Sequence, residues 1–317
     1  MHFFTRLKVA HITVIIPVLN AMPHLTEALA SLEAQTFKDF EVCLWDNGST
    51  DGSVEEARRW ISGRLAGKVV AGRSLPLHEC LARMVQDART EFIARMDGDD
   101  VCLPERFQKQ IQHLNQNPDV SVLGSQCFPI DAQGNQLHEP LHFPESFVAV
   151  LSKFMIGNAV LHPSVVFRKS SILEAGNYKL YEKPCEDLDL WLRVASRHKV
   201  TSLPDPLLKY RLHESSVTGK AKHAQSLENH VLNCLKRHTR NLFGIDPEDY
   251  VRLRSKRYIP SLFPILRAAK CIQARCGIPI GEVLRQSDLI WSARCLTARI
   301  DVFSRFCYSF FERCYLR

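Results

Sequence analysis

The sequence predicts an α/β protein whose mostly parallel sheet is flanked by helices. Two observations support this class. Short apolar runs rich in β-branched residues alternate with helical patterns of 10–15 residues through the first hundred positions, which is typical of βαβ units. The composition, 45% hydrophobic and 24% charged, is that of a globular protein. The sequence has no apolar run of 18 residues, so we expect no transmembrane helix.

The first hundred residues supply the parallel part of the sheet. The expected strands are 11–20, 39–46, 67–73 and 90–97. The helices expected between them are 25–36, 54–65 and 77–88, each with apolar residues at helical spacing.

The pattern is looser after residue 100. A helix is expected to start after Pro104 and stop at Pro118, a short one to start at 171 and close at Gly176, and a third to span 186–198. Expected strands are 120–128 and 165–170, and 207–218 is a strand that leads into a polar loop. From about residue 221 the chain is expected to be mostly helical, so we predict a C-terminal helical extension.

Charge is distributed unevenly along the chain. Residues 219–317 contain 18 Lys and Arg and 8 Asp and Glu, a balance of +10, which leaves −3 for residues 1–218 and gives the total of +7. A basic region suits binding to an anionic membrane surface or to nucleic acid, and it is equally typical of solvated helical faces. The eleven cysteines show no CxxC pair, and the N-terminus lacks a signal-peptide cleavage site. Both features favour a cytoplasmic location with free thiols.

Polar residues follow the predicted parallel strands. Pro17 and Asn20 lie at the end of the first strand, Asp46 ends the second, and Asp97 and Asp99 end the fourth. Ligands of open α/β sheets bind outside the carboxyl ends of the strands, and carboxylates there suit Mg²⁺ or Mn²⁺.

The stretch "DGDD" has two other possible structural interpretations. An EF-hand calcium loop is excluded because its positions 5 and 12 would be Val101 and Gln108. A solvated Asp-Gly turn that caps a helix stays open on the local sequence alone.

Six motifs in order resemble the family 2 glycosyltransferases, which have the GT-A fold. They are "VIIPVLN", "WDNGSTDGS", "ARMDGDD", "HPSVVFR", "CEDLDLWLR" and "YRLHESSVT". The resemblance runs from about residue 12 to about 218. It implies a Rossmann-like nucleotide-binding sheet and transfer of a sugar from a nucleotide-diphosphate sugar, usually with inversion.

The resemblance also implies roles for individual residues. Pro17 and Asn20 would line the nucleotide pocket, Asp46 would recognise the base, commonly uracil, and Asp51 would shape the turn. "CLARMVQDA" departs from the family, which usually carries an Asn where this chain has Ala82 or a neighbour. That departure affects donor identity more than reaction type.

The acidic motif and a distant histidine would form the metal site. Arg95 precedes the motif, Asp97 would lie near the ribose and metal, and Asp99 would bind a metal bridging to the diphosphate. His213 would ligate that metal or touch a phosphate, and a purely structural role is equally open. His162 has no assigned role.

Asp187 resembles the catalytic base of the family. An inverting transfer needs one carboxylate to take the proton of the acceptor hydroxyl. Glu186 and Asp189 compete for this role, and carboxylates at a helix start also serve capping.

The function expected from these features is a metal-dependent, inverting glycosyltransferase of surface polysaccharide or lipopolysaccharide biosynthesis. Residues 1–218 would be the catalytic domain. Residues 219–317 would contact the membrane, the acceptor or another subunit. A nucleotidyltransferase is disfavoured because "PVLNAMPHL" lacks the glycine and basic residue of a triphosphate loop. The remaining rivals are a nucleic-acid-binding protein and an inactive glycosyltransferase-like protein.

Overall fold

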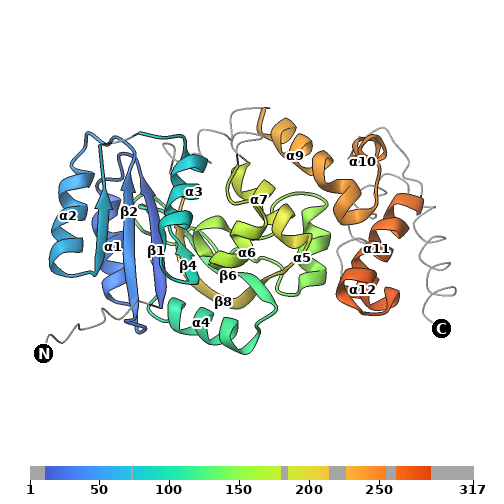
Figure 1. Ribbon diagram of the computed structural model, residues 1–317, viewed down its shortest axis with the longest axis horizontal. Helices are drawn as coiled ribbons and strands as arrows, with labels where there is room; N and C mark the ends of the chain where they lie inside the picture. Colours follow the sequence, from blue (N-terminus) through green and yellow to red (C-terminus); the bar gives the residue numbers. More distant parts are fainter. Residues whose placement is uncertain (1–10, 73, 180–184, 214–225, 255–261, 287–317) are drawn as a thin grey trace, which may run out of the picture. The chain divides into compact units, whose positions relative to one another are not determined.

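The protein is described by a computed structural model over residues 11–72, 74–179, 185–213, 226–254 and 262–286 (Figure 1). An eight-stranded mixed sheet with helices packed against it confirms the predicted α/β class. Among the helices in these ranges, none is long and apolar enough to cross a membrane.

One half of the sheet is parallel. The sheet order is β3-β2-β1-β4-β7-β6-β8-β5, and β1, β2, β3 and β4 run in the same direction. Their bounds are β1 Ile12–Val18, β2 Phe40–Asp46, β3 Gly67–Val70 and β4 Phe92–Arg95. The carboxyl ends of these strands therefore share one edge of the sheet, as the sequence predicted.

The other half of the sheet is mixed. Antiparallel pairs join β7 (Val166–Arg168) to β4 and β6, and β5 (Val101–Cys102) to β8. The long strands β6 (Val120–Ile130) and β8 (Lys199–Arg211) are parallel. The strand expected to start at 207 begins at Lys199. Proline cannot donate a ladder hydrogen bond, and the register between β6 and β8 shifts where Pro206 pairs.

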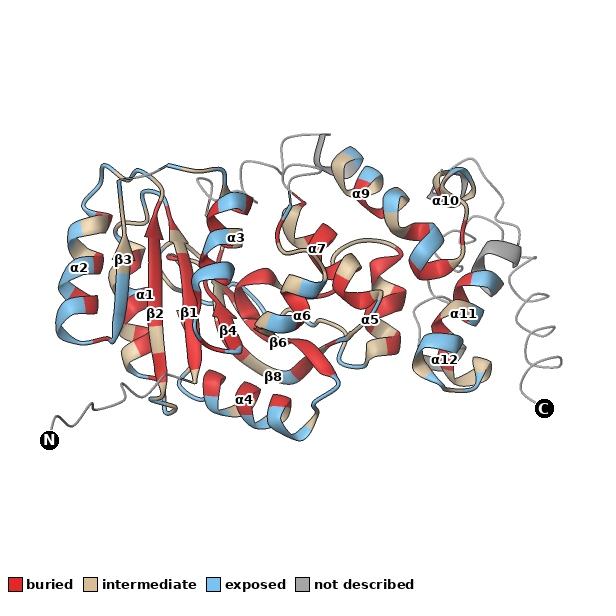
Figure 2. Ribbon diagram, in the orientation of Figure 1, coloured by how far each residue is buried: buried red, intermediate tan, exposed pale blue. Residues whose placement is uncertain are grey.

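Helices cover both faces of the parallel half. The helices α1 (His24–Glu33), α2 (Ser53–Gly63) and α4 (Arg106–Gln116) contribute to one apolar core, together with Ile12, Val14 and Ile16 of β1. Helix α3 (Leu77–Asp87) packs on β1 and β2. Figure 2 shows β1, β2 and β4 almost entirely buried. The short helices η1 (His162–Ser164) and α6 (Lys169–Glu174) flank β7.

The chain divides into two compact units. The first contains the described residues of Met1–Phe143, Val160–Leu180 and His198–Ala224, and the second those of Pro144–Ala159, Tyr181–Arg197 and Gln225–Arg317. Two segments from the predicted catalytic region thus group with the C-terminal helices. The division expected after residue 218 concerns function and stays a prediction.

The second unit is helical. Its helices are α5 (Phe147–Phe154), α7 (Glu186–Ala195), α9 (Ser226–Phe243), α10 (Pro247–Arg254), α11 (Leu262–Cys276) and α12 (Ile280–Gln286). The predicted helical character after residue 221 is confirmed over 226–254 and 262–286. Helix α5 was not predicted.

Candidate active site

Asn20 joins the loop after β1 to the loop after β2. Its backbone is left-handed, with φ of 54°, which asparagine tolerates better than most residues. The side-chain oxygen accepts a hydrogen bond from the Thr50 amide at 2.9 Å, and the Asn20 amide donates to Ser49 Oγ at 2.8 Å. Asn20 and Pro17 thus lie on the carboxyl edge of the sheet, where the sequence predicted them.

Asp46 is buried at the end of β2, with 2% of its surface exposed. Its carboxylate accepts hydrogen bonds from the amides of Gly48 at 3.0 Å and Ser49 at 3.2 Å. Gly48 has φ of 100°, a conformation that favours glycine. Asp46 therefore holds the turn of "DNGST". Recognition of a base by Asp46 stays a prediction.

Asp51 ties the same turn to the start of α1. It accepts hydrogen bonds from the Met22 amide at 2.8 Å and from Ser53 Oγ at 2.6 Å. Burial alone raises the pKa of Asp51, but these hydrogen bonds leave the pKa below its usual value. The turn-shaping role expected for Asp51 matches this geometry.

Asn47 also lies at this edge, next to Asp46 in the motif "WDNGSTDGS". Its amide nitrogen donates to the Leu75 carbonyl at 2.7 Å, and its oxygen accepts from the Leu75 amide at 2.6 Å. Asn47 thereby pairs the loop after β2 with the loop after β3. An aspartate here would place its charge against the Leu75 carbonyl.

Arg95 and Asp97 form a two-pronged ion pair. The two guanidinium nitrogens lie 2.5 Å from the two carboxylate oxygens. The Arg95 side chain is 6% exposed. Burial lowers the pKa of Arg95, but the negative charge of Asp97 and its hydrogen bond raise that pKa above its usual value. Arg95 thus fixes the orientation of Asp97, in the planar geometry that a guanidinium favours.

Gly98 allows the acidic motif to pass close to β1. A Cβ atom at this position would lie 2.8 Å from Val18 Cγ1 and 3.2 Å from Ala21 Cβ. Any larger residue would push the motif away from the end of β1. This contact explains the glycine between Asp97 and Asp99.

Asp99 is held by His213, which lies 114 residues further along the chain. Its carboxylate oxygen is 2.8 Å from His213 Nε2. The His24 ring lies 5.6 Å from the His213 ring. Burial, Arg211 and His213 lower the pKa of His24. The structure brings Asp99 and His213 together, with the His24 ring beside them, and the metal-binding role of His213 stays a prediction.

Asp100 is fully buried in the same cluster. Oδ1 accepts a hydrogen bond from the Arg211 amide at 2.9 Å, whereas Oδ2 has no hydrogen-bond partner among the described residues. Burial first, and then the charges of Asp97 and Asp99, raise the pKa of Asp100 well above its usual value. A buried carboxylate that has an unpaired oxygen and lies beside two other carboxylates is destabilising unless a cation binds there.

Arg211 braces the motif from β8. Its side chain donates to the Asp99 carbonyl at 2.7 Å and to the Asp131 carbonyl at 3.0 Å, and it pairs with Glu27 at 2.5 Å. The Arg211 guanidinium therefore contacts the backbone of the motif and the side chain of Glu27 in α1. In these contacts it does not bind the carboxylate groups of the motif.

These groups fit a hard divalent cation. Ligand atoms of Asp97, Asp99 and Asp100 all lie within 4.8 Å of one another. Carboxylate oxygens suit Mg²⁺ or Mn²⁺, and the unpaired oxygen of Asp100 is the kind of atom such an ion would satisfy. Asp100 is therefore an addition to the predicted set.

Asp187 lies in the first turn of α7, in the second unit. One of its oxygens accepts a hydrogen bond from Asn158 Nδ2 at 2.7 Å. Asp189, which competes with Asp187 for the role of base, is 2% exposed and pairs with Arg193 at 2.8 Å and His238 at 2.9 Å. Asp189 thus ties α7 to α9, which makes it a poor base.

His162 is buried in the first unit, 2.8 Å from the Tyr178 hydroxyl. Burial and then Arg95 hold its pKa well below the usual value, so the ring is neutral. Its position indicates a structural role behind Arg95.

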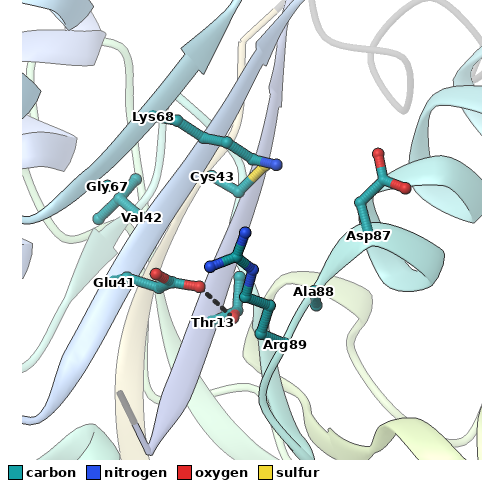
Figure 3. Close-up of a pocket in the computed structure, with 9 residues that line it drawn as sticks. All are labelled: Thr13, Glu41, Val42, Cys43, Gly67, Lys68, Asp87, Ala88 and Arg89. Atoms are coloured by element: carbon teal, nitrogen blue, oxygen red, sulfur yellow. Dashed lines mark hydrogen bonds between the residues drawn. The ribbon is translucent and has the colours of Figure 1, made fainter. Parts of the chain in front are cut away.

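A hollow of about 270 Å³ lies at the opposite edge of the sheet. It is lined by Thr13, Glu41, Lys68, Asp87 and Arg89, among others, near the amino ends of the strands. Figure 3 shows Lys68 and Arg89 extending into it between Glu41 and Asp87. These opposite charges balance each other. We therefore assign the site to the carboxyl edge, where the acidic cluster lies.

Comparison with known proteins agrees with the fold and the motifs. The chain is 33% identical over 190 residues to amylovoran biosynthesis glycosyltransferase AmsE of Erwinia amylovora, covering 59% of this chain and 70% of that protein. It is 28% identical over 219 residues to O-antigen biosynthesis glycosyltransferase WbnJ of Escherichia coli, covering 66% and 83%.

Solved structures share the fold. Staphylococcus aureus TarS, solved with UDP-GlcNAc, gives a TM-score of 0.56 at 18% identity and covers 91% of both chains. The mannosyltransferase PcManGT from Pyrobaculum calidifontis, solved with GDP-Man and Mn²⁺, gives 0.59 at 18% identity, covering 87% of this chain and 79% of that one.

The model of glycosyl transferase family 2 matches residues 13–171, half of the chain. The chain therefore belongs to glycosyl transferase family 2 and is a glycosyltransferase.

Proposed function

We propose that this protein is a metal-dependent, inverting glycosyltransferase that uses a nucleotide-diphosphate sugar. The observation that carries the proposal is the acidic cluster at the carboxyl edge, with Asp99 paired to His213 and Asp100 buried with one oxygen unpaired. UDP is the favoured nucleotide because of the Asp46 resemblance. Solved structures of the same fold that hold UDP-GlcNAc and GDP-Man support a nucleotide-sugar donor.

The donor side of the reaction belongs to the first unit. Asp99, Asp97 and His213, with Asp100 added, would hold Mn²⁺ or Mg²⁺. Such an ion supplies positive charge that offsets the charge of the leaving diphosphate. Arg95 orients Asp97, and Arg211 orients the backbone of Asp99. Pro17, Asn20 and Asp46 would surround the nucleotide.

The acceptor side would depend on Asp187. In an inverting transfer a carboxylate removes the proton of the acceptor hydroxyl while that oxygen attacks the anomeric carbon. Asp187 is proposed from the family resemblance and lies in the first turn of α7, whereas Asp189 is committed to charged partners. Asp187→Asn should keep donor binding and lose transfer. Normal turnover by that variant would remove the base assignment.

The acceptor is proposed from the relatives. AmsE and WbnJ are named for amylovoran and O-antigen biosynthesis. We infer by analogy a saccharide or lipid-linked saccharide of a surface polysaccharide or lipopolysaccharide.

Residues 219–317 are proposed to contact the acceptor, another subunit or the inner face of the cytoplasmic membrane. The balance of +10 and the aromatic residues of 287–317, a segment outside the described residues, motivate the membrane option. Co-sedimentation of the full chain with anionic and with zwitterionic vesicles tests it. Equal, weak pelleting with both would exclude an electrostatic attachment.

Thermal melting tests the donor site directly. We would add UDP, GDP, CMP or dTDP, each with and without Mn²⁺, to the wild type, to Asp99→Asn and to Asp87→Asn. Asp87 is an exposed carboxylate at the opposite edge of the sheet and serves as the matched control. A ligand at about 100 times its dissociation constant stabilises the protein by roughly 2.7 kcal/mol.

We expect one nucleotide to raise the melting temperature, and only when Mn²⁺ is present. This rise should persist in Asp87→Asn and disappear in Asp99→Asn. An equal rise in Asp99→Asn would refute the metal assignment. The absence of a rise with all four nucleotides would count against the proposed donor class.

A further inference from the structure

Arg211, the last residue of β8, is a buried cation beside the acidic motif. Its side chain is 1% exposed, and its ion-pair partner is Glu27 of α1, at 2.5 Å. In the part of the chain that the structure describes, no ion pair joins Arg211 to the carboxylates of Asp99 or Asp100. The buried charge of Arg211 is therefore offset by Glu27, and Arg211 does not neutralise these two carboxylates.

The guanidinium of Arg211 divides its donors among three segments of the chain. Nε donates to the Asp99 carbonyl at 2.7 Å, and Nη1 donates to the carbonyls of Asp131 and Ala132 at 3.0 and 3.2 Å. Nη2 donates to Glu27 Oε2 at 2.5 Å. One side chain thus joins the acidic motif to α1 and to the turn after β6.

The turn after β6 is itself held by hydrogen bonds. The Asp131 carboxylate accepts from the Asn135 amide at 2.9 Å and from Asn135 Nδ2 at 3.1 Å. Gly134 has φ of 88°, and a Cβ atom there would lie 3.8 Å from Arg211 Nη1 and 4.0 Å from Glu27 Oε1. The turn therefore packs directly against the ion pair and fixes the place of the guanidinium.

Arg211 holds the peptide group between the two carboxylates that it does not pair with. The Asp99 carbonyl, which accepts from Nε, belongs to the peptide bond that joins Asp99 to Asp100. The Arg211 amide donates to Asp100 Oδ1 at 2.9 Å. Ligand atoms of Asp97, Asp99 and Asp100 lie within 4.8 Å of one another, and like charges so close repel. Without the contacts of Arg211, this repulsion would move the carboxylates apart whenever no cation is bound.

These contacts require the shape of arginine. A guanidinium presents five N–H donors in a fixed plane, whereas the lysine ammonium presents three donors from one nitrogen. The acceptors of the Arg211 side chain are three backbone carbonyls and the Glu27 carboxylate, and they belong to separate segments. A lysine would keep the charge but lose part of this set, because a single nitrogen cannot span it.

We propose that Arg211, held by Glu27, is a positioning residue of the metal site, which fixes the peptide between Asp99 and Asp100 so that their carboxylates stay together for Mn²⁺ or Mg²⁺. The proposal rests on the proposed function, because it requires the acidic cluster to bind a metal. By charge alone, a cation beside the site repels a divalent ion, so removing Arg211 would tighten Mn²⁺ binding. A positioning role predicts the opposite sign.

The dissociation constant of Mn²⁺ tests this prediction. We would measure it from the electron paramagnetic resonance signal of free Mn²⁺, with and without UDP, for the wild type, Arg211→Met and Arg211→Lys. Methionine removes the charge and fills much of the volume, whereas lysine keeps the charge and loses the fork. Both variants should bind Mn²⁺ about 10- to 100-fold more weakly, the usual effect of losing a residue that orients metal ligands.

A milder variant keeps the test decisive if the Arg211 variants do not fold. Glu27→Asp conserves the charge and shortens the side chain, and it should weaken Mn²⁺ binding about 2- to 5-fold, the effect of a half-exposed ion pair. Glu33→Asp is the matched control, because Glu33 lies on the same helix and pairs with Arg64 at 2.5 Å on the surface. It should bind Mn²⁺ like the wild type.

Turnover separates positioning from a purely structural role. Excess Mn²⁺ should restore the kcat of Glu27→Asp to the wild-type value, whereas a variant that only loses folded protein would be slow at every Mn²⁺ concentration. Tighter Mn²⁺ binding by Arg211→Met would overturn the proposal, as would equal binding by Glu27→Asp and Glu33→Asp. A wild type that binds no Mn²⁺ in either condition would instead refute the metal site of the proposed function. Equal Mn²⁺ binding by the wild type and all variants would refute only the role of Arg211.

Discussion

Asp100 has the least favourable environment of the acidic residues at the site when no metal is bound. Its carboxyl is 0% exposed, one oxygen is unpaired, and Asp97 and Asp99 are close. We predict that Asp100→Asn melts at the same or a higher temperature than the wild type in EDTA, because an amide can donate to the neighbouring carboxylates. The gain should be about 1–2 kcal/mol.

The same substitution should abolish most of the stabilisation that Mn²⁺ gives the wild type. Melting curves of both proteins in EDTA and in Mn²⁺ measure the two effects together. A variant that is less stable in EDTA, or that keeps the full Mn²⁺ response, would show that Asp100 serves the fold rather than the metal.

The contacts of single residues show where sequence reasoning is limited. Asp97 and Asp99 could be predicted because "DGDD" is a local pattern. Asp100 is adjacent, but its burial depends on Arg211, 111 residues away. His24 reaches the cluster only through the packing of α1 beside the motif. No local pattern carries such information.

Helix α7 depends on an ion-pair network for its attachment to α9. Asp189 is 2% exposed, Arg193 and His238 are each 14% exposed, and Arg237 lies 3.6 Å away. Removing one partner of a buried pair leaves the others uncompensated. We predict that Asp189→Asn lowers the free energy of unfolding by about 3 kcal/mol at pH 7, measured by urea denaturation. Asp205→Asn, which breaks a half-exposed pair with Lys109, should cost under about 1 kcal/mol.

The effect of Asp189→Asn should depend on pH. Burial alone raises the pKa of Asp189, but His238 and Arg193 lower it below its usual value of 3.8. A carboxylate with a lowered pKa stabilises the fold above its usual pKa and loses that contribution as the pH falls through the folded-state pKa. The difference between wild type and variant should therefore be smaller at pH 3 than at pH 7. An equal difference at both values would indicate a packing effect instead.

An element could be predicted from the sequence where its local pattern of apolar residues is clear. The strands and helices of the first hundred residues were predicted because apolar runs and helical spacing alternate without interruption. The start of β8 was missed because Pro204 and Pro206 break the strand pattern, and pairing with β6 outweighs that local preference. Helix α5 was missed because its eight residues are mostly apolar, and short apolar runs do not distinguish helix from strand.

At the scale of the whole molecule, the two compact units interleave along the chain. The sequence indicated a single change of character near residue 218, where the family resemblance ends and the basic region begins. Long-range packing instead decides which segments belong to each compact unit. Helix α7 packs on α9, and α5 packs on α11 and α12, so both helices group with the C-terminal region. Helical patterns show that such helices exist, but they do not show which earlier segments those helices cover.

This interleaving predicts how a chain ending at residue 218 should behave. The described residues of the first unit, which include Asp97, Asp99 and His213, lie within 1–218. Helices α5 and α7 would lose the helices that cover them. Trp191 and Phe154, both 0% exposed, belong to those two helices. We predict that the shortened protein keeps its melting response to nucleotide and Mn²⁺ but loses sugar transfer. Its amides in 144–159 and 185–197 should exchange hydrogen much faster than in the full chain, because packing supplies most helix stability in proteins. Retained transfer with protected amides in α7 would show that the base segment folds without the C-terminal helices. Loss of the nucleotide response together with transfer would show that the first unit also needs them.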